Sequence, residues 1–96
     1  MRRAARIDAN QPEIVKGLRE AGVEVQSLAG MGDGVPDLLV SWGGANILLE
    51  VKDPDQPPSK RKLTDDQVTW HAKWKGPCFV VTTTQEALQR VYEVAA

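Results

Sequence analysis

The sequence predicts an α/β domain in which a mixed sheet lies between helices, with the element order αβββαβα. Two apolar runs on either side of Gly43 and Gly44 predict a β-hairpin. Three segments begin with a capping residue that is followed three positions later by Glu or Gln, a pattern typical of helix starts. An apolar run that begins at Cys78 follows the second of these helices, and strands joined by a crossover helix normally run parallel.

The length and composition predict one globular domain over residues 1–96, with residues 1–9 as a basic N-terminal arm. The net charge of −1 gives no nucleic-acid signal for the whole chain, so any such signal must be local. The single Cys78 excludes an internal disulfide and favours a reducing cytoplasm. We expect neither a signal peptide nor a membrane-spanning segment, and therefore no membrane partner.

Each helix start follows from its capping pattern. The first helix is expected to begin at Asn10, with Glu13 as its capping-box partner, and to end at Gly22. A strand is expected over residues 23–28, followed by a glycine-rich loop over residues 30–34 that permits close backbone approach beside the acidic site. The later helices are expected to begin with the capping boxes Thr64 with Gln67 and Thr83 with Glu86.

The hairpin register predicts an acidic pair. With the two glycines as the loop, Leu39 pairs with Leu48 and Asp37 pairs with Glu50. Opposed side chains have Cβ atoms about 4.5–5.5 Å apart, and like charges at that spacing destabilise a sheet. A divalent cation would offset the repulsion. Because side chains alternate along a strand, Lys52 lies on the same face as Glu50.

Cations and aromatic residues follow the hairpin. The run Lys60, Arg61 and Lys62 lies in an exposed proline-rich loop, and Arg2 and Arg3 lie in the N-terminal arm. These cations are candidates for DNA phosphate contacts, with solvated charge as the alternative. In the helix expected to begin at Thr64, three residues fall on one face: Gln67, His71 and Trp74. Trp70 lies one position away from this face. As the only histidine, His71 excludes catalysis by paired histidines, and we expect a packed or surface position for it rather than a metal-ligand role.

The order Pro36-Asp37, hairpin, Glu50-x-Lys52 resembles the core motif of the PD-(D/E)xK nucleases, with their restriction-endonuclease-like core. Within that group the chain is most similar to the VRR-NUC family, and to its small stand-alone viral members. If the protein is viral, as this resemblance implies, the cytoplasm is that of a bacterial host. Four blocks in family order carry the resemblance: Gly34-Val-Pro-Asp37, Glu50-Val-Lys52, Leu63-Thr-Asp-Asp-Gln67 and Gly76-Pro-Cys-Phe-Val-Val81.

The resemblance implies a Mg²⁺ or Mn²⁺ ion held by Asp37, Glu50 and the backbone carbonyl of Val51. Hard oxygen ligands of this kind select those ions over softer metals. The resemblance also implies that Lys52 orients or activates the attacking water. Two further residues match family positions that complete the site: Glu13 and Gln67.

We therefore expect a metal-dependent endodeoxyribonuclease that hydrolyses phosphodiester bonds in branched DNA, resembling a Holliday-junction resolvase. Because one small domain has one acidic site and a junction requires two cuts, we expect a homodimer. A flap- or nick-cleaving nuclease is one alternative. Others are a non-cleaving nucleic-acid-binding or adaptor domain, and a small α/β interaction domain in which Asp37 and Glu50 are simply exposed.

Overall fold

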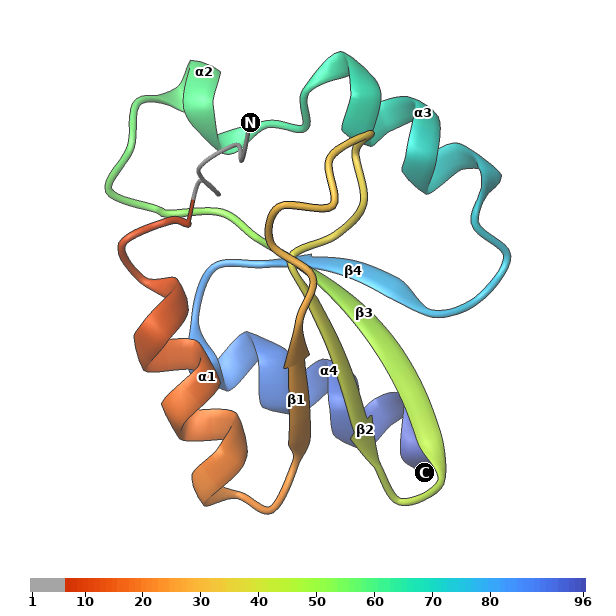
Figure 1. The fold of residues 1–96 in the computed structure, drawn as a ribbon. Helices are drawn as coiled ribbons and strands as arrows, with labels where there is room; N and C mark the ends of the chain where they lie inside the picture. Colours follow the sequence, from red (N-terminus) through yellow and green to blue (C-terminus); the bar gives the residue numbers. More distant parts are fainter. Residues whose placement is uncertain (1–6) are drawn as a thin grey trace.

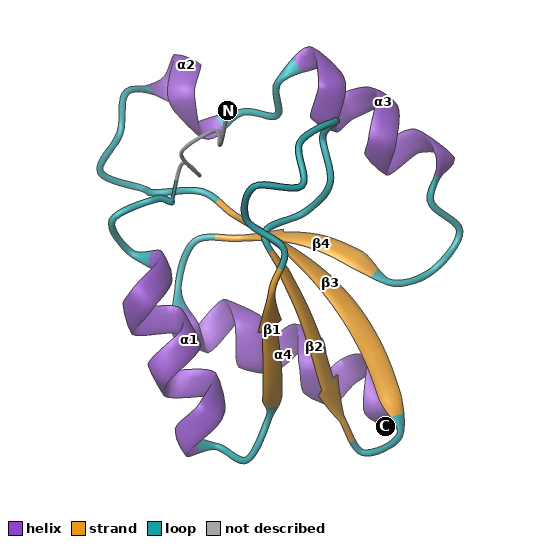
Figure 2. Ribbon diagram, viewed as in Figure 1, coloured by secondary structure: helices purple, strands orange, loops and turns teal. Residues whose placement is uncertain are grey.

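The computed structural model describes residues 7–96 (Figures 1 and 2). Arg2 and Arg3, with most of the predicted arm, lie outside the described residues. The elements are α1 (Gln11–Glu20), β1 (Glu24–Ser27), β2 (Leu38–Trp42), β3 (Ala45–Val51), α2 (Pro58–Arg61), α3 (Asp65–Lys73), β4 (Cys78–Val81) and α4 (Thr84–Ala95). The predicted order is confirmed except for α2, a one-turn helix in the proline-rich loop. No helix within residues 7–96 is long and apolar enough to cross a bilayer.

The four strands form one mixed sheet in the order β1-β2-β3-β4. β2 pairs antiparallel with both β1 and β3, whereas β3 and β4 run parallel, as the crossover argument predicted. In the hairpin, Leu39 pairs with Leu48 and Trp42 with Ala45, so the predicted register is confirmed. This register brings the residue before β2, Asp37, towards the end of β3.

Two helices and one face of the sheet enclose the core. α1 and α4 pack together and against this face (Figure 2). The core side chains are Ile14, Leu18, Val23, Val25, Leu38, Val40, Ile47, Leu49, Val51, Val81, Ala87 and Val91. α3 lies apart from this layer, and all of its residues are at least partly exposed. The opposite face of the sheet is therefore more open, and Leu39 and Val80 on it are 38% and 41% exposed.

The predicted capping box at Asn10 is wrong. α1 does begin at Gln11, but the Asn10 side chain makes no capping hydrogen bond. Its amide instead donates to the backbone carbonyls of Lys52, at 3.1 Å, and Thr82, at 2.8 Å. These two residues follow the parallel strands β3 and β4, so Asn10 ties the start of α1 to the ends of both strands. An asparagine amide has two N–H donors, and here both are used on carbonyls that the sheet leaves free.

The other two predicted capping patterns are present, one in full and one in part. The box of Thr64 and Gln67 is confirmed in full. At α4, the Thr83 hydroxyl accepts from the backbone N–H of Glu86 at 3.1 Å, as predicted. The Glu86 carboxylate, however, accepts from the backbone N–H and hydroxyl of Thr82 rather than from the backbone of Thr83. These hydrogen bonds hold the pKa of Glu86 below its ordinary value.

The glycine-rich loop lies directly against the start of α3. Gly34 has φ +81°, and a Cβ atom added there would lie 2.3 Å from the carbonyl oxygen of Asp66 and 2.8 Å from the nitrogen of Gln67. The predicted close backbone approach is therefore confirmed. It fixes where α3 sits, and with α3 the side chain of Gln67.

Gly34→Ala should destabilise the protein more than Gly32→Ala does. Both glycines have positive φ, which costs an L-residue about 1–2 kcal/mol. A Cβ at Gly32 meets no atom within 4 Å in the described part of the chain, whereas one at Gly34 collides with the backbone of α3. The collision should add about 1–3 kcal/mol. Urea unfolding of both variants measures the difference, and equal loss of stability would show that the loop does not position α3.

Candidate active site

A cleft of about 790 Å³ lies at the end of β3, and its wall includes Lys60 of α2 and Gln67 of α3. It brings together six residues that the sequence predicted for the site: Asp37, Glu50, Lys52, Lys60, Lys62 and Gln67. The hairpin supplies the acids and Lys52, the proline-rich loop and α2 supply the other cations, and α3 supplies the glutamine. Segments separated in sequence thus converge on one polar cavity.

The acidic pair forms the floor of this cleft. Glu50 lies in β3 and is only 2% exposed, while Asp37 is half-buried immediately before β2. The two carboxyl groups are close enough for the charge of Asp37 to act on Glu50. Burial, followed by the charge of Asp37, raises the pKa of Glu50 to about 8. Without a bound cation, the Glu50 carboxyl therefore keeps its proton at neutral pH.

Asp37 is positioned by the backbone of the opposite strand. Its Oδ2 accepts a hydrogen bond from the backbone N–H of Val51 at 2.7 Å. Its own backbone carbonyl accepts from the N–H of Leu28, which follows β1. The Asp37 side chain is therefore anchored between β1 and β3, beside the backbone of Val51. The role of the Val51 carbonyl as a metal ligand remains a prediction.

The Gln67 amide links the helix cap to the acidic pair. Its Oε1 accepts from the Lys52 ammonium at 2.8 Å and from the backbone N–H of Thr64 at 2.9 Å. Its Nε2 donates to Oε2 of Glu50 at 3.1 Å. Lys52 Nζ lies 3.7 Å from the same carboxylate oxygen. One amide therefore orients both the lysine and the glutamate, and its own direction is fixed by the start of α3.

The acidic pair fits a hard divalent cation. Oε1 of Glu50 is buried and receives no hydrogen bond from residues 7–96, although a buried carboxylate oxygen normally has a partner. In the described range no three His, Cys, Asp or Glu side chains gather closely enough to hold a metal ion by themselves. Mg²⁺ commonly uses only one or two carboxylates and takes its remaining ligands from water and phosphate. Asp37 and Glu50 would hold such an ion.

The structure does not bring Glu13 to the cleft. Glu13 is exposed on α1 and lines a separate hollow together with Asp53 and Thr82. A different acid, Asp8, lines the cleft instead. Burial, followed by the charge of Asp37, raises the pKa of Asp8. The sequence analysis missed Asp8 because it falls in the predicted arm, and no local motif marks it.

The predicted phosphate-binding cations divide into three groups. Lys60 and Lys62 line the cleft beside the acidic pair. Arg61 lies between them in the chain and is exposed, but it is not part of the cleft wall. Arg2 and Arg3 lie outside the described residues. Two of the five cations are therefore placed where a phosphate could reach both them and the acids.

His71 and Cys78 form a neutral pair beside the site. His71 Nδ1 lies 3.6 Å from Cys78 Sγ, joining α3 to β4. Burial and the charge of Lys52 lower the pKa of His71, and burial raises the pKa of Cys78 to about 11. The thiol is therefore a poor nucleophile at neutral pH. As predicted, His71 occupies a packed helix position.

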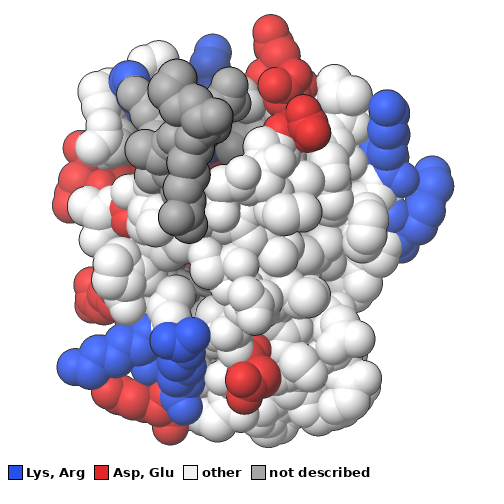
Figure 3. All heavy atoms as spheres, viewed as in Figure 1, with Lys and Arg blue, Asp and Glu red and all other residues white. Residues whose placement is uncertain are grey.

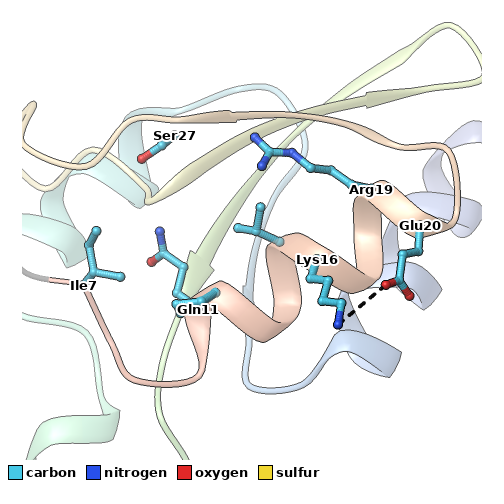
Figure 4. Close-up of a pocket in the computed structure, with 8 residues that line it drawn as sticks. Ile7, Gln11, Lys16, Arg19, Glu20 and Ser27 are labelled. Atoms are coloured by element: carbon cyan, nitrogen blue, oxygen red, sulfur yellow. Dashed lines mark ion pairs between the residues drawn. The ribbon is translucent and has the colours of Figure 1, made fainter.

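A second hollow, of about 670 Å³, lies between α1 and the edge of β1 (Figure 4). Its wall includes Ile7, Gln11 and Arg19, and the exposed ion pair of Lys16 with Glu20, at 3.9 Å, lies at its rim. None of the residues that the sequence predicted for catalysis or metal binding lines it. The cleft of Asp37 and Glu50 is therefore the candidate active site.

Comparisons of the chain with protein-family models, with curated proteins and with solved structures give no significant match. The resemblance to the VRR-NUC family therefore remains a prediction from sequence motifs.

Glu50→Gln should abolish a pH dependence of stability in the metal-free protein. The unfolded carboxyl ionises near pH 4.5, but the folded one keeps its proton until about pH 8. Between these values the unfolded state binds fewer protons, so stability falls as pH rises, by about 3 kcal/mol at pH 7. Thermal melts in EDTA from pH 4 to 9 measure this loss. Glu24→Gln, at the exposed end of β1, should keep the wild-type dependence, and an unchanged slope in Glu50→Gln would contradict the assignment.

Proposed function

We propose that the protein is a Mg²⁺- or Mn²⁺-dependent endodeoxyribonuclease. The observation that carries the proposal is the pair of carboxyl groups formed by half-buried Asp37 and buried Glu50, which lies beside the Lys52 ammonium in a cleft lined by further cations. Two ionised carboxylates this close repel each other unless a proton or a cation offsets their charge, and functional sites are where such arrangements are retained.

The residues of the cleft have different roles in the proposed hydrolysis of a phosphodiester. A divalent ion, when bound, offsets negative charge on the phosphate oxygens and lowers the pKa of water. Lys60 and Lys62 bind and orient the phosphate backbone. Lys52, held by the Gln67 amide, orients the attacking water and stabilises developing charge. Asp37 and Glu50 would hold the metal ion, beside Lys52.

We infer that the fold is a PD-(D/E)xK nuclease core of the VRR-NUC type. The support is the order of the motifs along a mixed sheet: Pro36-Asp37 enters β2, and Glu50 and Lys52 lie at the end of β3. The parallel strand β4 and the Thr64–Gln67 capping box agree with the same arrangement. An interaction domain with two simply exposed acids is a poor match, because Glu50 is buried.

We propose branched DNA as substrate and a homodimer as the working unit. Asp37 and Glu50 give each chain one candidate metal site, whereas a four-way junction needs two symmetric cuts. A two-fold dimer supplies two sites that are related by two-fold symmetry, as the two cuts in a four-way junction are. A flap- or nick-cleaving enzyme, for which one site suffices, is the alternative.

Cleavage of a substrate panel tests the function. Linear duplex, nicked duplex, flap and four-way junction are incubated with Mg²⁺, Mn²⁺ or EDTA, and both strands are mapped while light scattering gives the mass. We expect metal-dependent, paired cuts in branched DNA by a dimer. Asp37→Asn keeps an acceptor for the Val51 N–H and relieves repulsion, so it should lose metal binding without losing stability. Undiminished metal affinity in this variant, measured by calorimetry, would refute the site.

Lys52→Ala should lower single-turnover cleavage by roughly 10²- to 10⁴-fold, the usual size for loss of a catalytic proton-transfer group. Its affinity for DNA should stay close to wild type. Lys62→Ala is the matched control, because it removes a lysine from the rim of the same cleft. That variant should bind DNA less tightly, most clearly at low salt, yet cleave normally once saturated. Full activity in Lys52→Ala would show that Lys52 only pairs with Glu50 and has no catalytic role.

A further inference from the structure

α3 carries a pair of stacked indoles at its C-terminal end. The rings of Trp70 and Trp74 have centroids 4.6 Å apart and planes inclined by only 17°. Trp74 is 48% exposed. Large aromatic side chains normally bury most of their surface, so an exposed stacked pair is unusual for a chain whose core contains no tryptophan among its described residues.

The pair is held in place by its own helix and by the following turn. The backbone N–H of Trp74 donates to the carbonyl of Trp70, which keeps the two residues one helical turn apart. A Cβ atom at Gly76 would lie 3.1 Å from the indole Nε1 of Trp74, so the backbone of Gly76 passes beside the ring edge. A ring that is fixed before binding loses little conformational freedom when a ligand stacks on it.

The same helix enters the candidate active site at its other end. Gln67, which contacts Glu50 and Lys52, precedes Trp74 by two helical turns on one stripe of α3. Seven residues of helix span about 10 Å. That length equals the rise of about three stacked bases in one DNA strand. A strand whose phosphate lies in the cleft can therefore place a base beside the indoles.

The surroundings of the indole pair are positively charged. Lys73 and Lys75 flank Trp74 in the chain, and both are exposed. Within residues 7–96 neither has a carboxylate within 4.0 Å. Figure 3 shows positive side chains at the edge of the molecule where α3 ends. Aromatic rings interleaved with cations are typical of surfaces that bind single-stranded nucleic acid.

We propose that Trp70 and Trp74 form a stacking platform for an unpaired nucleotide of the DNA strand held in the cleft. The proposal rests on the proposed function, and it narrows the substrate to DNA with an unpaired base near the scissile phosphate, as at a flap or an opened branch point. Lys73 and Lys75 contact the phosphates on either side of that base. Fully paired duplex offers no free base face and does not engage the platform.

Binding to matched DNA substrates tests the platform. A duplex with a short single-stranded flap and a fully paired duplex of equal length are titrated in EDTA, with 2-aminopurine in the flap to report stacking. Trp74→Ala should weaken flap binding by about 5- to 100-fold and reduce the quenching of 2-aminopurine, while duplex binding is unchanged. Trp74→Phe should recover most of both signals. Trp42→Ala is the control and should leave flap binding unchanged. Trp42 is 37% exposed, but it lies at the hairpin turn and packs edge-to-face with Tyr92.

Three results would overturn the proposal. Equal losses of affinity for flap and for duplex DNA would mean that Trp74 shapes a groove that binds DNA without regard to unpaired bases. An unchanged flap affinity would mean that no base stacks there, and a change of mass in Trp74→Ala by light scattering would make the pair a contact between chains. Failure of the nuclease proposal can be told apart from failure of the platform. If no substrate is cut with Mg²⁺ or Mn²⁺, the nuclease proposal is wrong. If Trp74→Ala still binds the flap less tightly in that case, the stacking platform is nevertheless supported.

Discussion

The burial of the Glu50 carboxyl is the constraint on which the rest of the site depends. A carboxylate deep in a protein is costly unless it is paired and hydrogen-bonded. Here the nearest neighbour, Asp37, has the same charge, and the compensating groups are one amide from Gln67 and the more distant ammonium of Lys52. Burial and the charge of Asp37 outweigh the charge of Lys52, so the carboxyl stays protonated near neutral pH. This arrangement also leaves one buried oxygen available for a stronger partner.

The parts of this arrangement that are local in sequence could be predicted. A two-glycine turn and strict alternation fix the hairpin register, so the juxtaposition of Asp37 and Glu50 follows from counting residues. The Thr64–Gln67 capping box follows from the preference of a threonine hydroxyl for a free helix N–H. The dual use of Gln67 could not be foreseen from the box alone. Its second set of contacts depends on where Gly34 allows α3 to sit.

The N-terminal part of the site depends on long-range packing, and there the local rules failed. Asn10 has the right type and spacing for a cap, but its amide finds the unpaired carbonyls at the ends of β3 and β4 instead. Spacing within α1 pointed to Glu13, although the rotation of that helix on the sheet turns Glu13 away and leaves Asp8 at the cleft. Such choices are made by tertiary contacts that a single sequence does not display.

The guanidinium of Arg19 has a consequence for how copies of this chain can meet. β1 is an edge strand, and its Val25 carbonyl accepts from Arg19 Nη2 at 3.3 Å. Exposed edges invite strand addition from other molecules, and a charge placed along the edge discourages it. An incoming strand at β1 must first displace the arginine from that carbonyl. The β1 edge of the sheet is thereby protected from open-ended growth into fibres.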